Sequence, residues 1–143
     1  MIDLGSWRAT LAPIGEPTVD GRVLASDNAV RPHAEQPRPL WHDRPGAGRR
    51  LIGTVDSSEV VDGVLIAAGS FRVDDADEWY TMGLIEGMRA GRIVPVVELV
   101  DVEIDPARAG CCPPRVTSGV IGGVLAVPAD TAGWAISRFE VEA

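Results

Sequence analysis

Residues 51–73 read LIGTVDSSEVVDGVLIAAGSFRV, and this stretch decides the fold class. Two runs rich in Val, Ile and Leu lie on either side of Asp62-Gly63. Asp-Gly between two apolar runs is a strong short-range signal of a β-hairpin, because both residues tolerate the positive φ of a tight turn. The sequence therefore predicts a β-rich protein built around this hairpin.

Further strands are expected on both sides of the hairpin, where β-branched residues recur between turn signals. They cover residues 6–14 (SWRATLAPI), a short segment at 39–42, residues 93–104 (IVPVVELVDVEI), residues 115–128 (RVTSGVIGGVLAVP) and an edge strand near the C-terminus (WAISRFEVEA). About seven strands and one helix predict a single domain over residues 1–143 with a β-rich α+β fold. We expect a closed or nearly closed antiparallel β-barrel decorated by the helix.

One helix is predicted over residues 75–90. Asp74 or Asp75 suits its N-cap, and Gly91 suits the position after its C-terminus. Trp79 and Ile85 fall on one face at helical spacing, so we expect the helix to pack against the barrel through them.

Residues 25–39 contain several prolines and few apolar residues, which favours a loop over a regular element. Such a segment orders itself poorly alone but suits extended docking. It is therefore predicted to be a partner-contact arm and not core. Its candidate contact residues are Arg31, Pro32, Pro37 and Arg38.

Composition limits the possible partners and locations. The chain has 21 carboxylates and 13 basic residues, all of them Arg, for a net charge of −8. This balance argues against nucleic acid as the main partner. No apolar run is long enough to span a membrane, and the N-terminus lacks the pattern of a signal peptide, so synthesis in the cytoplasm is expected.

No metal or cofactor site is predicted. Cys111 and Cys112 are adjacent and lack zinc-ligand spacing with either histidine, so they are expected to be free thiols. An acidic run at the start of the predicted helix could bind a cation, but a solvated helix N-terminus is the favoured interpretation. That run consists of Asp74, Asp75, Asp77 and Glu78.

Several short motifs follow one another in a characteristic order: LAPIG, WHD, IGTVD, a helix ending in Gly, then IVPVVEL and VTSGVIGGVLAVPA. This order and spacing resemble the capsid maturation protease (prohead protease) family of tailed bacteriophages, especially the type carried by actinobacteriophages. The resemblance covers residues 7–140. It implies an assemblin-like β-barrel and cleavage of capsid or scaffold protein by a catalytic serine.

The chain departs from that family at the catalytic positions. The resemblance aligns the serine with Val96, which has no hydroxyl to attack a peptide bond. It aligns the general base with His42. In this chain His42 directly follows Trp41, whereas the family pattern has one more residue between the Trp and the His. The residue that orients the histidine is a Glu or His late in the barrel, yet residues 115–129 contain no Glu, Asp or His. His42 and Val96 are therefore interpreted as vestigial, and no catalytic residue is expected.

Other nucleophiles remain open at this point. The candidates are Ser57, Ser58, Ser118, Cys111 and Cys112, and nothing in the sequence places any of them beside His42. His33, in the proline-rich segment, is expected to be structural or solvated.

The resemblance thus predicts a catalytically inactive protease-fold protein of a bacteriophage capsid. It would be a minor capsid, decoration or assembly protein that binds the major capsid protein, with self-association possible, made in the host cytoplasm and carried in the virion. An active capsid maturation serine protease is the alternative. A host-encoded or regulatory binding module with a similar barrel is a third reading.

Overall fold

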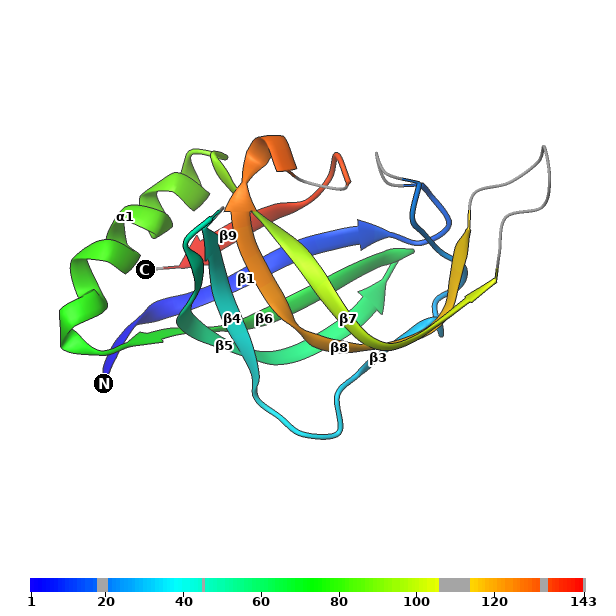
Figure 1. The fold of residues 1–143 in the computed structure, drawn as a ribbon, viewed down its shortest axis with the longest axis horizontal. Coiled ribbons are helices and arrows are strands. Elements are labelled where there is room, and N and C mark those ends of the chain that lie inside the picture. The colour runs from blue at the N-terminus through cyan, green and yellow to red at the C-terminus, as the bar shows by residue number, and fades with distance from the viewer. Residues whose placement is uncertain (18–20, 45, 106–113, 132–133, 143) are drawn as a thin grey trace.

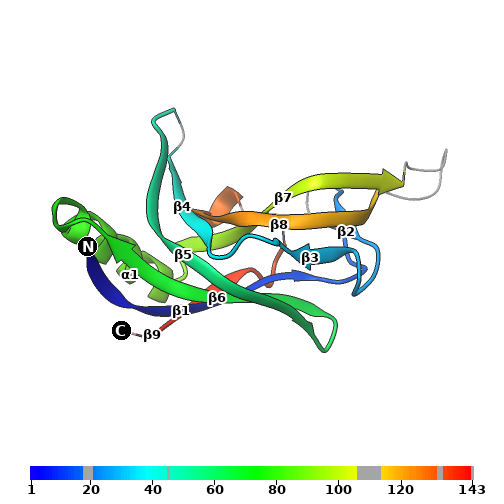
Figure 2. The same cartoon turned by 90° about the horizontal axis from the view of Figure 1, so that it is seen from below.

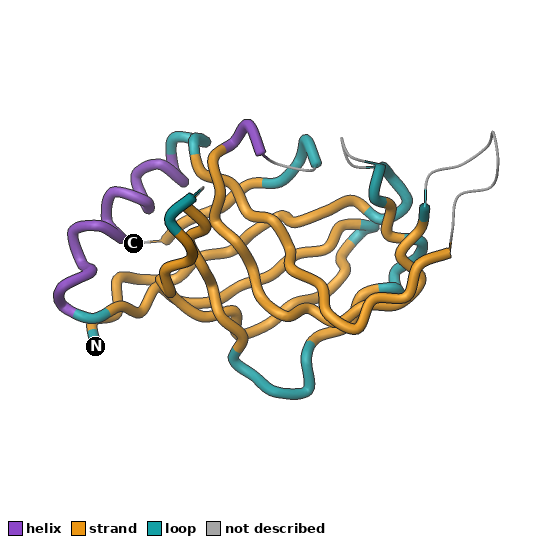
Figure 3. Tube along the Cα trace, in the orientation of Figure 1, coloured by secondary structure: helices purple, strands orange, loops and turns teal. Residues whose placement is uncertain are grey.

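The computed structural model of the chain describes residues 1–17, 21–44, 46–105, 114–131 and 134–142. As predicted, these residues are rich in strand and contain one α-helix (Figures 1 and 3). The strands are β1 (Ile2–Pro13), β2 (Val23–Leu24), β3 (Val30–Pro32), β4 (Arg38–Arg44), β5 (Gly48–Val61), β6 (Val64–Val73), β7 (Ile93–Asp105), β8 (Arg115–Pro128) and β9 (Arg138–Glu142). The helical elements are η1 (Asp75–Asp77), α1 (Glu78–Arg89) and η2 (Ala129–Thr131).

All of the described strands join one sheet, and several of them pair with β8. On one side β8 pairs antiparallel with β7. On its other side it pairs in succession with β2, β3 and β4, all three of them parallel. From β4 the sheet continues through β5, β6 and β1 to β9 by antiparallel pairs. The pairing is mainly antiparallel, as expected, although the return of the chain alongside β8 adds parallel pairs and makes the sheet mixed.

The prediction of a closed barrel is wrong: the sheet curls but stays open (Figure 2). In the described part of the chain the outer strands β7 and β9 each pair with a single strand, so no row of backbone hydrogen bonds joins them. Helix α1 contacts both β7 and β9. The two outer strands also contact each other, so at that end of the molecule the edges meet by packing and not by strand pairing.

The predicted hairpin is confirmed and forms the turn between β5 and β6. Asp62 and Gly63 both have positive φ, at 51° and 75°, as the tight hairpin turn requires. Farther along the same pair the strands approach very closely: a Cβ on Gly53 would lie 2.2 Å from the Ser70 carbonyl oxygen, and one on Gly69 would lie 1.8 Å from that of Thr54. Only glycine fits at these positions, and the close approach accompanies the curl of the sheet.

The concave face of the sheet holds the core. Its largest fully buried side chains include Leu11, Leu24, Leu40, Ile52, Leu65, Phe71 and Ile121. Each large apolar side chain buried in this way contributes roughly 1.5–3 kcal/mol. Trp7 packs edge-on against Phe139 with ring centroids 5.7 Å apart, which helps to hold the paired strands β1 and β9 together.

Helix α1 begins later than predicted, at Glu78 after the 3-10 turn, with Asp77 as N-cap. Gly91, with φ 76°, follows its C-terminus as expected. Ile85 is buried as predicted, but Trp79 is 87% exposed, so the expectation that Trp79 packs on the sheet is wrong. The buried face consists of Thr81, Ile85, Gly87 and Met88. Among the described residues no helix is long and apolar enough to cross a membrane.

Residues 25–39 do not form a loop throughout, which corrects the prediction. Val30–Pro32 is strand β3, paired with β8, and Ala29 and Val30 lie in the core. The burial of these two apolar side chains depends on the pairing of β3 with β8. Composition alone does not reveal this pairing. The stretch 34–37 is exposed, so the arm-like part of the segment is shorter than expected.

Candidate functional site

His42 lies near the end of β4, where the first turn of α1 covers the concave face of the sheet. It belongs to a group of four side chains from three parts of the chain, which we call the His42 cluster: His42, Arg50, Asp77 and Tyr80. Strand pairing sets Arg50 directly opposite His42. The tight turn between β4 and β5 and the helix start after η1 thus bring the cluster together.

The cluster is joined by polar and aromatic contacts. His42 Nδ1 and the Tyr80 hydroxyl form a short hydrogen bond, and the two rings are tilted with centroids 5.5 Å apart. The Arg50 guanidinium lies over the Tyr80 ring, 4.4 Å from its centroid, and pairs with Asp77 at 3.6 Å. Such a cation–π contact at a partly exposed site contributes about 0.5–1 kcal/mol. The helix and the β4–β5 hairpin are therefore linked through His42 and Arg50.

The surroundings of His42 favour its neutral form. Burial lowers the pKa of His42 from its usual value, and the Arg44 and Arg50 guanidinium groups lower it further. Asp43 acts in the opposite direction and raises the pKa. A neutral imidazole can accept a proton, so His42 retains the chemistry of a base.

Val96, which the resemblance aligns with the catalytic serine, is on the other side of the sheet. Two neighbouring rows of residues cross strands β7, β8 and β4 at this point. The first row consists of Pro95, Ala126 and His42, and the second of Val96, Leu125 and Trp41. Successive residues of a strand point to opposite faces, so the two rows project in opposite directions. Burial agrees, because Pro95 and Ala126 are buried in the concave face whereas Val96 and Leu125 are half-buried on the convex face.

Val96 therefore shares its face with Trp41 and Leu125, and not with His42. Leu51, paired with Trp41, extends this apolar row onto β5. The ion pair of Arg49 with Glu98, at 2.7 Å, links the same two outer strands of the row, β5 and β7. The structure thus does not bring His42 and Val96 together.

The other serine candidates lie far along their strands from His42. Ser118 is eight residues from Ala126, the neighbour of His42 on β8, or about 26 Å at 3.3 Å per residue. Its hydroxyl is bound by the Arg31 guanidinium at 3.4 Å. Ser57 and Ser58 are at least seven residues from Arg50, the neighbour of His42 on β5, or about 23 Å. None of these hydroxyls is within reach of His42.

The remaining predicted residues are placed as follows. Cys111 and Cys112 lie outside the described residues. His33 Nδ1 accepts a hydrogen bond from the Glu35 amide at 2.9 Å within its own turn. Arg38 donates through Nε to the Gly122 carbonyl at 3.0 Å, so this arm residue is held on β8. Pro32 and Pro37 are exposed.

One residue of the acidic run around the helix start belongs to the His42 cluster, because Asp77 pairs with Arg50. Asp74 and Asp75 are exposed. In the described part of the chain no group of three or more His, Cys, Asp or Glu side chains is arranged to hold a metal ion.

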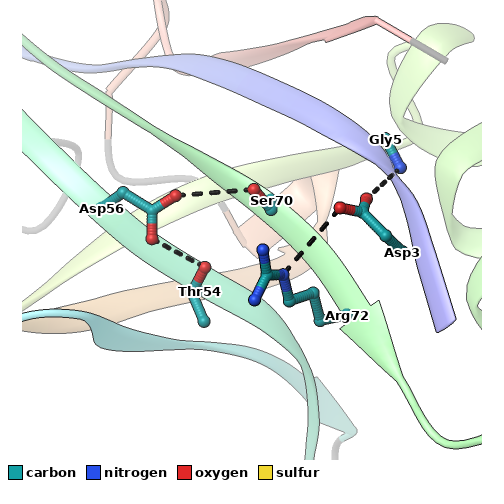
Figure 4. A network of polar contacts seen from close by, with 6 residues as sticks. All are labelled: Asp3, Gly5, Thr54, Asp56, Ser70 and Arg72. Atoms are coloured by element: carbon teal, nitrogen blue, oxygen red, sulfur yellow. Dashed lines mark hydrogen bonds and ion pairs between the residues drawn. The ribbon is translucent and has the colours of Figure 1, made fainter. Parts of the chain in front are cut away.

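A second polar network lies on the convex face of β1, β5 and β6 (Figure 4). Asp56, the extra residue of a bulge in β5, accepts hydrogen bonds from Thr54 at 2.8 Å and Ser70 at 3.5 Å. Next to it Asp3 pairs with Arg72 at 3.9 Å. The Ser70–Asp56 hydrogen bond links the bulged β5 to β6, and the Asp3–Arg72 ion pair links β6 to β1.

Sequence reasoning missed Tyr80 and Arg50. Tyr80 is the only tyrosine in the chain, and it directly follows Trp79, which drew attention to the wrong face of the helix. The pairing of Arg50 with His42 depends on the length of the β4–β5 turn, for which the sequence offers no specific signal.

Comparison with protein-family models, with curated proteins and with solved structures found no significant match to the chain.

Proposed function

We propose that this chain is a non-catalytic structural protein of a bacteriophage capsid that binds the major capsid protein. The observation that carries the non-catalytic part is the register of β7, β8 and β4. It sets the Val96 position and His42 on opposite faces of the sheet, so a nucleophile at position 96 would not meet the base.

The partners of His42 support the same proposal. In a serine hydrolase a carboxylate orients the imidazole and stabilises its charged form. Here the Tyr80 hydroxyl, and not a carboxylate, contacts Nδ1, and the Arg44 and Arg50 guanidinium groups oppose protonation of the ring. Among the described residues no serine, threonine or cysteine side chain is hydrogen-bonded to the ring. In this proposal His42 stabilises the contact of α1 with the sheet instead of catalysing a reaction.

The capsid part of the proposal rests on the motif order described above. Sedimentation with assembled shells of the major capsid protein tests it, with the intact masses of both proteins recorded before and after incubation. We expect the chain to sediment with the shells at a saturable ratio and both masses to stay unchanged.

Two results would overturn the proposal in different ways. If the chain stays in the supernatant at every concentration, the capsid-binding claim is wrong. If a defined fragment of the capsid protein appears with wild type and is absent with His42→Ala, the chain is a protease and the alternative reading holds.

A further inference from the structure

The outward face of α1 carries a large apolar surface that the chain does not use for its own folding. Trp79 is 87% exposed and Met82 is 48% exposed. The buried face of the helix, around Thr81 and Ile85, lies on the opposite side. Soluble proteins rarely expose a whole indole beside another large apolar group without a binding role.

Gly83 provides a second, independent observation on the same face. A Cβ built on Gly83 would meet no atom within 4 Å, so no contact among the described residues requires glycine there. Glycine in a helix interior costs about 1 kcal/mol relative to alanine. Beside Trp79 and Met82 its missing side chain leaves a shallow notch, which allows close approach by another backbone.

The charge around this face selects the kind of partner. Asp74 and Asp75 are exposed just before the helix, and Glu78 is half-exposed in its first turn. In the described part of the chain none of these three carboxylates is in an ion pair. A second copy of this chain would bring the same carboxylates face to face, and like charges oppose that contact. A basic partner is favoured instead.

We infer that the α1 face formed by Trp79, Met82 and Gly83 docks a partner segment in which an apolar anchor is flanked by Arg or Lys. The apolar anchor would sit in the notch at Gly83 against the indole, and the basic side chains would pair with Asp75 and Glu78. This inference rests on the proposed function, in that the segment would belong to the major capsid protein.

The test measures the affinity of variants for assembled capsid shells. Trp79→Ala and Gly83→Gln are expected to weaken binding by roughly tenfold or more, because each alters the centre of the contact. The double variant Asp75→Asn/Glu78→Gln should weaken it and reduce its salt dependence. Leu51→Ala is the matched control, since Leu51 is 47% exposed, like Met82, but lies on β5. It should bind as wild type does.

Unchanged binding by Trp79→Ala and Gly83→Gln, with wild type binding the shells, would overturn this inference and leave the proposed function intact. If wild type does not bind the shells, the proposed function is wrong, and the face is tested with short peptides that alternate Leu with Arg or Leu with Glu. The inference requires a blue shift of Trp79 fluorescence with the Arg peptide that is absent in Trp79→Phe. An equal response to the Glu peptide, or no response to either, contradicts it.

Discussion

The side chains of His42 and Val96 project from opposite faces of the sheet, although only strand β8 separates their backbones. A base and a nucleophile must come within hydrogen-bond distance to act together, and a sheet between them prevents this. Under the proposed alignment, the valine at position 96 is therefore one of two separate obstacles to catalysis. The second is the register itself.

This arrangement predicts that Val96→Ser gains no proteolytic activity. The new hydroxyl would join Leu125 and Trp41 on the convex face, and because Val96 is half-buried the cost in stability should be about 1 kcal/mol. The intact mass of capsid protein incubated with the variant is the measurement. Cleavage by Val96→Ser that His42→Ala abolishes would show that the two positions meet in solution.

The lowered pKa of His42 predicts a specific dependence of stability on pH. Because the folded state disfavours protonation, the unfolded chain binds more protons between the folded pKa of His42 and its usual value of 6.5. The contribution of His42 is therefore fully present above pH 6.5 and is lost as the pH falls through the folded pKa. Urea unfolding between pH 4.5 and 8, in roughly half-unit steps, measures it.

His42→Gln is the control for this effect, since glutamine does not titrate. The difference in unfolding free energy between wild type and His42→Gln should grow from acid to neutral pH and then level off. A difference that is constant across this range, or one that shrinks as the pH rises, would mean that the pKa of His42 is not lowered in the folded chain.

Two glycines of α1 should respond in opposite ways to alanine. Gly83→Ala should stabilise the fold by about 0.5–1 kcal/mol, because the new methyl group meets nothing and alanine favours the helix. At Gly87 a Cβ would lie 2.8 Å from Ile93 Cγ1, so Gly87→Ala should destabilise by about 1–2 kcal/mol. Thermal unfolding of both variants checks the pair. Equal shifts of the melting temperature would mean that α1 is rotated from the orientation described.

The exposure of Trp79 predicts that it matters little for folding. Trp79→Ala should change the unfolding free energy by less than about 0.5 kcal/mol, whereas Ile85→Ala should cost about 2–5 kcal/mol, because Ile85 is 4% exposed. Denaturant unfolding of the two variants is the measurement. A large loss of unfolding free energy with Trp79→Ala would mean that Trp79 packs against the sheet, as helical spacing first suggested.

Local signals predicted the hairpin and the end of the helix well. The Asp62-Gly63 turn and Gly91 depend on backbone preferences that a few residues carry by themselves. The exposure of Trp79 could not be read in this way, because residues 79, 82 and 85 fit one helical face as plausibly as 81, 85 and 88 do. Which of the two is buried depends on β7 and β9, which lie far away in the sequence.

The features that shape the site were the least accessible to sequence reasoning. Strand β3 forms where β8 supplies its partner edge, and the outer strands β7 and β9 approach each other and α1 without pairing. The separation of His42 from Val96 follows from a register across three strands, and a shift of one residue in it would reverse the faces. Neither pattern nor spacing fixes such a register.

Mass spectrometry of purified mature virions tests the central claim most directly, by quantifying this chain against the major capsid protein. The account predicts that the full-length chain is present at a fixed ratio, and that the termini of the capsid protein are identical with wild type and with His42→Ala. If the chain were found in immature particles but absent from mature ones, with capsid termini that depend on His42, the account of a non-catalytic capsid protein would be contradicted.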